Sequence, residues 1–294
     1  MFRILAFLLL PVICLAQVNS NGEKPTGELL SNEISPNEIK RNASFNLDEI
    51  KVRWKKAALE NCTGVPCLTA PSFTCGTSTI SDVDNNVYET VSIGNQCLTK
   101  QNLRVTRYND DTPIPFDATE TSPGDFTSLI WQNRLTGAYT IYENGSNTGT
   151  DAKNYGFLYN WYATAGIVTP MGSPTKNICP KGWHVPTDGE WNGLIGYLGG
   201  ALNAGSEMKS PSLLWTSQNV PIVNSSGFTA LPGGMRRDHG AFSNIRNAAF
   251  FWSATQDAIT PSSGVSHFME HYNSRVVFNP WPKSSGLSIR CLKD

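Results

Sequence analysis

The sequence lacks an excess of charge of either sign. Lysine and arginine total 23, aspartate and glutamate total 24, and the formal net charge is −1. A protein that binds nucleic acid through the phosphate backbone needs a basic surface, so this balance argues against nucleic acid as a partner. Charged residues make up 16% of the chain and hydrophobic residues 39%, with 25 glycines. This composition is typical of a folded, loop-rich and strand-rich protein.

No long apolar run occurs after the first 17 residues. Residues 1–17 have one early charge, Arg3, then an apolar run, then small residues at the end, which is the pattern of a secretory signal peptide. The run is too short to span a bilayer. A lipoprotein acylated at Cys14 is a weaker alternative, because Ile13 stands where such sites need a small residue. We therefore expect an exported protein that does not span the membrane and is secreted, periplasmic or at the cell surface.

Cysteine spacings typical of metal sites are also absent. The chain has no C-x-x-C and no cysteine–histidine pair at ligand spacing. Loss of the signal peptide leaves an even number of cysteines, which in an exported chain predicts disulfide bonds. Spacing alone does not choose among the possible pairings. The remaining cysteines are Cys62, Cys67, Cys75, Cys97, Cys179 and Cys291.

Residues 18–71 are interpreted as a spacer before the main domain. Residues 18–45 are polar and nearly free of aromatic side chains, which predicts a flexible segment. A short helix is expected over about 46–61, with Leu47, Ile50 and Trp54 in one stripe. The tight loop that follows could be closed by a local Cys62–Cys67 disulfide. The main domain is expected over 72–294.

The clearest local prediction lies between Cys179 and Gly200. Residues 183–185 predict a short strand that Pro186 ends. Thr187 followed by Glu190 forms a capping box, in which each side chain binds a free amide at the start of a helix. The helix continues with one apolar stripe, formed by Trp191, Leu194, Ile195 and Leu198, and ends at Gly199 and Gly200.

Short apolar runs bounded by turn residues predict the remaining elements. Strands are expected over 87–93, 103–108, 227–234, 249–255, 265–272, 275–278 and 286–291. The aromatic run 155–165 predicts buried core, in which we favour a short helix.

The sharpest catalytic candidate is His267-Phe-Met-Glu-His271, which has the H-x-x-E-H form of a zinc protease. That chemistry needs both histidines on one face of a helix, a glutamate base and a third ligand. The flanking residues instead predict a strand, in which His267 and His271 share a face and Glu270 points away. Asp294 is the sole acidic residue downstream. We expect neither a metal nor a cofactor, and keep a metal-dependent hydrolase built on His267, Glu270 and His271 as an alternative.

Two weaker patterns have simpler explanations. Ser206-Glu-Met-Lys209 matches the S-x-x-K of serine acyl-enzymes, but the accompanying S-D-N and K-T-G motifs are absent. The run of oxygen-bearing residues from Asp82 to Asn86 could ligate calcium. A turn held by the same side chains is the simpler interpretation.

Seven segments, taken in order, resemble one family. They are 86–97, 102–104, 155–163, 179–187, 226–234, 251–255 and 286–291. Their number and order are similar to those of the Fibrobacter succinogenes major paralogous domain, over roughly residues 72–294. Leu98 departs from the family, which commonly has tryptophan there, and we expect another buried apolar side chain.

This resemblance implies an α+β, C-type-lectin-like fold with short twisted antiparallel strands, two short helices and long loops. The fold is distantly similar to that of formylglycine-generating enzymes. It implies the disulfides Cys179–Cys291 and Cys75–Cys97, which leaves Cys62–Cys67. No cysteine lies between Cys179 and Cys291, so formylglycine-type oxidation is not expected. The Glu-Pro-Asn, Gln-Pro-Asp and Trp-Asn-Asp triplets of calcium-dependent lectins are absent from the domain.

A candidate binding surface falls within residues 235–281, where aromatic rings supply contact area and polar side chains supply direction. We expect a non-catalytic, ligand-binding or adhesion module with a surface glycan or a protein as ligand. A structural component of a surface layer is a further alternative, in which these are ordinary loop residues. The candidates are Arg236, Arg237, Asp238, His239, Asn244, Arg246, Asn247, Trp252, His267, Glu270, His271, Tyr272 and Trp281.

Overall fold

The computed structural model describes residues 72–118, 129–146, 148–216 and 221–294, which belong to the unit Ser72–Asp294. The expected signal peptide, the spacer, the helix over 46–61 and the Cys62–Cys67 pair lie outside the described residues. In the part of the chain that is described, no helix combines the length and the apolar character needed to cross a membrane.

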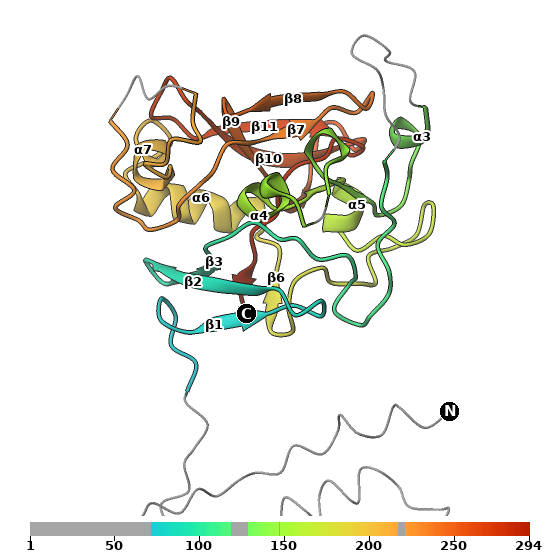
Figure 1. Ribbon diagram of the computed structural model, residues 1–294, viewed down its shortest axis with the longest axis horizontal. Coiled ribbons are helices and arrows are strands. Elements are labelled where there is room, and N and C mark those ends of the chain that lie inside the picture. Colours follow the sequence, from blue (N-terminus) through green and yellow to red (C-terminus); the bar gives the residue numbers. More distant parts are fainter. Residues whose placement is uncertain (1–71, 119–128, 147, 217–220) are drawn as a thin grey trace, which may run out of the picture. The chain divides into compact units, whose positions relative to one another are not determined.

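The first sheet brings together both ends of this unit. Its strand order is β1-β2-β3-β12-β6, all antiparallel (Figure 1). Leu292 in the last strand pairs with Leu98 on one side and with His184 on the other. The strands are β1 (Thr79–Ser81), β2 (Val87–Ile93), β3 (Gln96–Thr99), β6 (Trp183–His184) and β12 (Leu292–Lys293).

Two disulfides lie beside this sheet. Cys75 is bonded to Cys97, and Cys179 to Cys291, with both members of the second pair fully buried. These are two of the three pairs that the family resemblance implied. The Cys179–Cys291 bond closes a chain segment of 112 residues, so it joins the start of the α6 region to the last strand.

The second sheet has the order β11-β10-β9-β7-β8. Its pairs are antiparallel, apart from β7 with β9, which is parallel. The predicted strand over 249–255 and the hairpin around residues 273–274 are confirmed. The strands are β7 (Gly233–Arg236), β8 (Phe242–Ile245), β9 (Ala248–Gln256), β10 (Ser263–Glu270) and β11 (Val277–Pro282).

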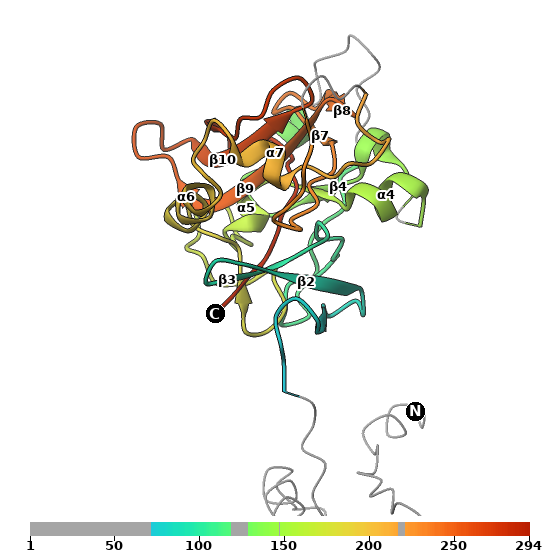
Figure 2. The same ribbon diagram turned by 90° about the vertical axis from the view of Figure 1, so that its left-hand side faces the viewer.

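Short helices lie between and beside the sheets. Figure 1 shows α4, α5 and α6 at a level between the two five-stranded sheets, and Figure 2 shows α6 beside β9 and β10. With antiparallel sheets and short helices the unit is α+β. The helices are α3 (Leu129–Gln132), α4 (Thr150–Tyr155), α5 (Trp161–Thr164), α6 (Asp188–Tyr197), α7 (Ala204–Met208) and the 3-10 helix η1 (Tyr142–Asn144), and β4 (Tyr139–Thr140) pairs with β5 (Leu158–Tyr159).

The capping box of α6 is confirmed. The Thr187 hydroxyl accepts from the Glu190 amide, and the Glu190 carboxylate accepts from the Thr187 amide at 2.7 Å. Trp191, Leu194 and Ile195 are buried. Trp191 contacts the rings of Phe228 and Phe251, so it anchors the helix to the second sheet as the stripe predicts.

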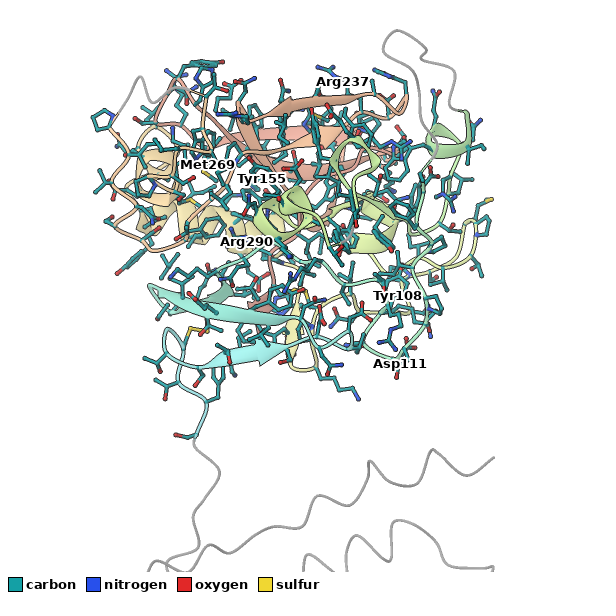
Figure 3. The ribbon with its side chains drawn as sticks, in the orientation of Figure 1. Tyr108, Asp111, Tyr155, Arg237, Met269 and Arg290 are labelled. Carbon is teal, nitrogen blue, oxygen red and sulfur yellow. A yellow bond between two sulfur atoms is a disulfide. The ribbon has the colours of Figure 1, made fainter. Side chains whose placement is uncertain are left out.

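Buried polar side chains bond to main-chain carbonyls inside the core. The Trp252 indole donates to the Tyr159 carbonyl at 2.7 Å. Arg290, which is 1% exposed, donates to the carbonyls of Thr99 and Phe228 (Figure 3). Burial lowers the pKa of Arg290 to about 9. Carbonyl oxygens that would otherwise be unpaired inside the protein are therefore satisfied by one guanidinium.

Several predicted elements differ from the structure. Residues 103–108 are extended but form no regular strand, because the Leu103 amide and carbonyl bond to two different segments, at Ile289 and Phe157. The aromatic run 155–165 is core as expected, but the helix begins only at Trp161. The strand predicted over 227–234 begins only at Gly233, so residues 227–232 lie before it. Residues 286–288 form isolated bridges, and the last strand is confined to 292–293.

Candidate functional site

The register of the second sheet separates the candidate residues into two groups. Glu270 of β10 pairs with Ala248 at the start of β9, whereas Gly264 pairs with Gln256 at its end. The turns 244–247 and 270–275 therefore lie at the first end of the sheet. Trp281 pairs with Gly264 at the second end. The turn 237–241 also belongs to the second end, because β7 runs parallel to β9.

Two turns distant in sequence meet at the first end. The amide of His271 donates to the carbonyl of Asn247 at 2.9 Å. Tyr272 is 51% exposed, and its ring lies edge-on to His271. We call this group the paired-turn surface, and it consists of Asn244, Arg246, Asn247, Glu270, His271 and Tyr272. The first three are exposed, and Glu270 and His271 are half-buried.

A buried lysine holds the second of these turns from below. Lys209 is 0% exposed, and its Nζ donates to the carbonyls of Glu270 at 2.9 Å and Asn273 at 2.6 Å. Its Nζ also lies over the ring of Trp215. Burial lowers the pKa of Lys209 to about 8. Lys209 is therefore engaged by the turn, and the Ser206 hydroxyl of the S-x-x-K pattern donates elsewhere, to Asn203.

Helix α7 packs directly against the same turn. The Gly205 amide donates to the Ser274 carbonyl at 2.9 Å. A Cβ at Gly205 would lie 2.5 Å from the Arg275 carbonyl oxygen, so only glycine permits this approach. Figure 1 shows α7 beside the second sheet. The turn is thus supported by main-chain contacts as well as by Lys209.

The first turn has an unusual backbone. Asn244 and Arg246 have φ angles of 64° and 66°. This left-handed region costs roughly 1 kcal/mol for a residue with a Cβ, less for asparagine. Main-chain bonds retain it, from the Arg246 amide to Pro232 and from Thr216 to the Arg246 carbonyl. Backbone strain of this kind is concentrated at functional sites, although it does not by itself define one.

The charged and polar side chains of the paired-turn surface differ in whether a neighbouring side chain already engages them. Glu270 accepts from the Asn273 side chain at 3.2 Å. A hydrogen bond with Glu270 also raises the pKa of Tyr272. Within the described ranges, the Arg246 guanidinium has no ion pair and no hydrogen bond. The surface therefore presents a guanidinium, amides and a phenol ring to solvent.

Burial removes three residues from the set expected to contact a ligand. Arg236, Trp252 and His267 are 0%, 0% and 1% exposed, so none can touch a ligand at the surface. Arg236 donates to the main-chain carbonyls of Asp117 and Gly240. Both faces of β9 and β10 are covered, so His267 is buried against Trp191 on one face and Trp252 against Tyr159 on the other, which the sequence alone did not identify.

The other candidates lie at the second end of the sheet. Arg237 bonds to the Ser243 hydroxyl at 3.3 Å, and the turn with Asp238 and His239 is half-buried. Trp281 is half-buried against Phe250. Figure 3 shows Arg237 apart from Met269, which precedes Glu270. The single surface expected over 235–281 is therefore two.

The zinc-protease pattern does not form the geometry that its chemistry needs. His267 lies in a strand, and its Nε2 is 2.9 Å from Asp188 Oδ1. His271 lies beyond the end of β10, so the expectation that the two histidines share one strand face is wrong. Among the residues that the structure describes, no three histidine, cysteine or acidic side chains form a group that could hold a metal.

Residues 82–86 form a turn held by Asp82, which is the simpler of the two interpretations given for this run. Asp82 Oδ1 accepts from the amides of Asp84 and Asn86, and its Oδ2 accepts from the Tyr88 hydroxyl at 2.6 Å. These are the contacts of an Asx turn. An open groove of about 540 Å³ lies alongside, and none of the ligand-binding candidates within residues 235–281 lines it; its lining includes Ile80, Asp82, Asn109, Asp111, Lys181 and Trp183.

Sequence reasoning missed two features of α6. Its first turn carries Asp188 and Glu190, and each pairs with a histidine from a different sheet. His184 is held between two carboxylates, with Nδ1 2.6 Å from Asp294 and Nε2 3.1 Å from Glu190. The acidic first turn was visible in the sequence, but its partners are 6 and 79 residues away.

Comparison with known proteins identifies the domain. The family model of the Fibrobacter succinogenes major domain matches residues 91–293. The chain belongs to this family. The match covers most of both sheets, the Cys179–Cys291 bond and the whole paired-turn surface. In the other two comparisons, no curated protein and no solved structure matches this chain.

Proposed function

We propose that this domain is an exported, non-catalytic ligand-binding module with a C-type-lectin-like fold, and that it binds through the paired-turn surface. The observation that carries the proposal is the junction of two distant turns at His271 and Asn247. Lys209 supports this junction from the core, and exposed polar and aromatic side chains cover it.

The construction of the surface favours recognition. A ligand that meets a preformed surface does not have to order it, so less free energy is lost on binding. Tyrosine and arginine are the side chains that contribute most at binding hot spots. Tyr272 and Arg246 are both accessible, and Asn244 and Asn247 add directional hydrogen bonds. A glycan or a protein at the bacterial surface or in the periplasm is the ligand class we propose, with adhesion as the outcome.

Two features support the finer assignments of fold and location. The last strand, β12, lies between β3 and β6 and is tied to the α6 region by Cys179–Cys291. C-type-lectin-like folds bring their first and last strands together, and here β1 and β12 share one sheet. Disulfides persist mainly in oxidising compartments, which favours export of the domain.

A glycan array and a pull-down from cell-envelope extract test the proposal. The mature chain should bind saturably in one of the two assays. Arg246→Ala with Tyr272→Ala should weaken that binding at least tenfold. Arg237→Ala is the matched control at the second end of the sheet and should leave it unchanged. If Arg237→Ala abolishes the binding and the double variant retains it, the binding site lies at the second end of the sheet. If neither assay shows saturable binding, a structural role is favoured.

A further inference from the structure

The first turn of α6 touches both sheets through histidine–carboxylate pairs. Asp188 meets His267 of the second sheet, with Oδ1 and Nε2 2.9 Å apart. Glu190 meets His184 of the first sheet, with Oε1 and Nε2 3.1 Å apart. The two carboxylates are two residues apart on one helical turn. This turn is therefore an electrostatic joint between the sheets.

The hydrogen-bond partners of the two rings favour opposite protonation states. A neutral imidazole has one N–H donor and one acceptor, and an imidazolium has two donors. Both nitrogens of His184 face carboxylates, from Asp294 and Glu190, so the imidazolium satisfies both contacts and the neutral ring only one. Within the part of the chain that the structure describes, His267 has one carboxylate partner, and its Nδ1 is buried with no hydrogen-bond partner. Its imidazolium would leave an N–H unpaired inside the protein, which is costly.

The surroundings of each ring agree with this assignment. His267 is 1% exposed and packs between Trp191 and Phe278. Its strand partners are Phe251 and Phe278, which do not titrate, so Asp188 is the charged group that faces it. Burial lowers the pKa of His267 despite the opposing effect of Asp188.

His184 is more exposed to solvent than His267, since about one-third of its side chain is accessible. Burial alone would lower its pKa, but the bonds to Asp294 and Glu190 outweigh that effect and raise the pKa. The other nearby charge is Lys293 on the neighbouring strand, whose Nζ lies over the ring of Phe73.

We infer that the first turn of α6 is a pH-sensitive joint, which loosens from the second sheet in acid and from the first sheet in alkali. Protonation of His267 strengthens its attraction to Asp188 but leaves a buried Nδ1–H unpaired, so opening of the joint, which lets water reach the ring, becomes easier; His184 meanwhile stays charged and keeps α6 on β6. Loss of the His184 proton has the reverse effect. The joint does not depend on the ligand of the paired-turn surface.

The sign follows from linkage. Because the folded pKa of His267 lies below its unfolded value of about 6.5, its contribution is complete above that pH and is lost as the pH falls. The folded pKa of His184 is raised, so its contribution is complete below about 6.5 and is lost as the pH rises through the folded pKa. The two contacts therefore respond to pH in opposite directions.

Ring NMR titration and amide hydrogen exchange of the full mature chain test the joint. Between pH 7 and pH 5, amides of β10 and the start of α6 should exchange about tenfold faster after correction for intrinsic rates, while β6 and β12 stay protected. His267→Gln should remove this acid response. His184→Gln should remove the alkaline loss of protection at β6. His239→Gln, at the far end of the second sheet, is the matched control.

The wild-type titration decides the matter even where a variant does not fold. A His267 ring that titrates below 6.5 and a His184 ring that titrates above it support the joint. Both rings titrating near 6.5, or uniform loss of protection across both sheets in acid, would overturn it.

Discussion

Lys209 Nζ lies 2.9 Å from the main-chain oxygen of Glu270, inside the protein and beneath the paired-turn surface. The same ammonium bonds to Asn273, so one buried cation holds both sides of a turn. This contact joins the core to the proposed binding surface, and it can be tested directly.

Replacement of this lysine should destabilise the domain. Lys209→Met keeps the length of the side chain but leaves the carbonyls of Glu270 and Asn273 without their donor. Unpaired buried acceptors cost about 1–3 kcal/mol each, so we expect a loss of roughly 3 kcal/mol in the free energy of unfolding. Urea denaturation measures it. Lys181→Met, an exposed lysine, should change stability by less than about 0.5 kcal/mol.

The same residue predicts a pH dependence. Because the pKa of Lys209 is lowered to about 8, the folded protein releases this proton before the unfolded chain, whose lysines titrate near 10.4. The unfolded state then binds more protons, so stability should rise between about pH 8 and pH 10 relative to Lys209→Met. Urea midpoints of both proteins across this range are the measurement. Parallel profiles for the two proteins would contradict the shift.

The two disulfides should contribute unequally. Cys179–Cys291 closes 112 residues and Cys75–Cys97 closes 22. Loop-closure entropy predicts about 5 kcal/mol for the longer loop and about 3 kcal/mol for the shorter. Cysteine-to-alanine variants of each pair, compared by thermal unfolding, should therefore rank in that order. A larger loss from the Cys75–Cys97 variant would mean that native-state packing, and not chain entropy, dominates.

A matched pair of glycine variants probes the packing around the two helices. Gly196 of α6 is exposed, and an added Cβ meets nothing within 4 Å, so Gly196→Ala should stabilise the domain by up to about 1 kcal/mol. At Gly205 of α7 the Cβ would press on the carbonyls of Ser274 and Arg275. Gly205→Ala should therefore destabilise the domain, and it should also alter the NMR signals of the 270–275 turn.

Arg290 offers a test of the buried core network. Arg290→Leu removes the donor to the Thr99 and Phe228 carbonyls and to the side-chain oxygen of Asn102. We expect a loss of about 3 kcal/mol or more in the free energy of unfolding. Arg237→Leu, whose guanidinium is half-exposed, is the control and should cost much less. Equal effects would show that the Arg290 bonds add little beyond packing.

Elements with a strong local signal could be predicted from the sequence. The capping box of α6 joins residues three positions apart, and the β10–β11 hairpin joins strands across a short turn. The run 286–291 shows the limit of such signals. It has the alternation of a strand, with Leu287 and Ile289 buried, but its main chain bonds to Tyr159, Arg236 and Phe251 in turn. No local pattern specifies partners so far apart.

The same distinction separates the candidate site residues. Residue type and turn chemistry were enough to select Arg246, Asn247 and Tyr272, since exposed turns carry such side chains. The burial of His267 depends on the face of β10 that meets α6, and the burial of Trp252 depends on Tyr159 covering the opposite face of β9; both are properties of the assembled sheets.

By itself the sequence determined the family, the capped helix and the balance of charge, because each depends on residue identity or on neighbours within a turn. Only the tertiary structure decided that Lys209 lies under the 270–273 turn, that Asp188 and Glu190 reach histidines in different sheets, and that the expected binding region divides in two. Apart from the Glu190–His184 contact, which joins residues 6 positions apart, these outcomes depend on contacts between segments dozens of residues apart. Chain topology and the exclusion of water bring such segments together, and local propensity does not encode them.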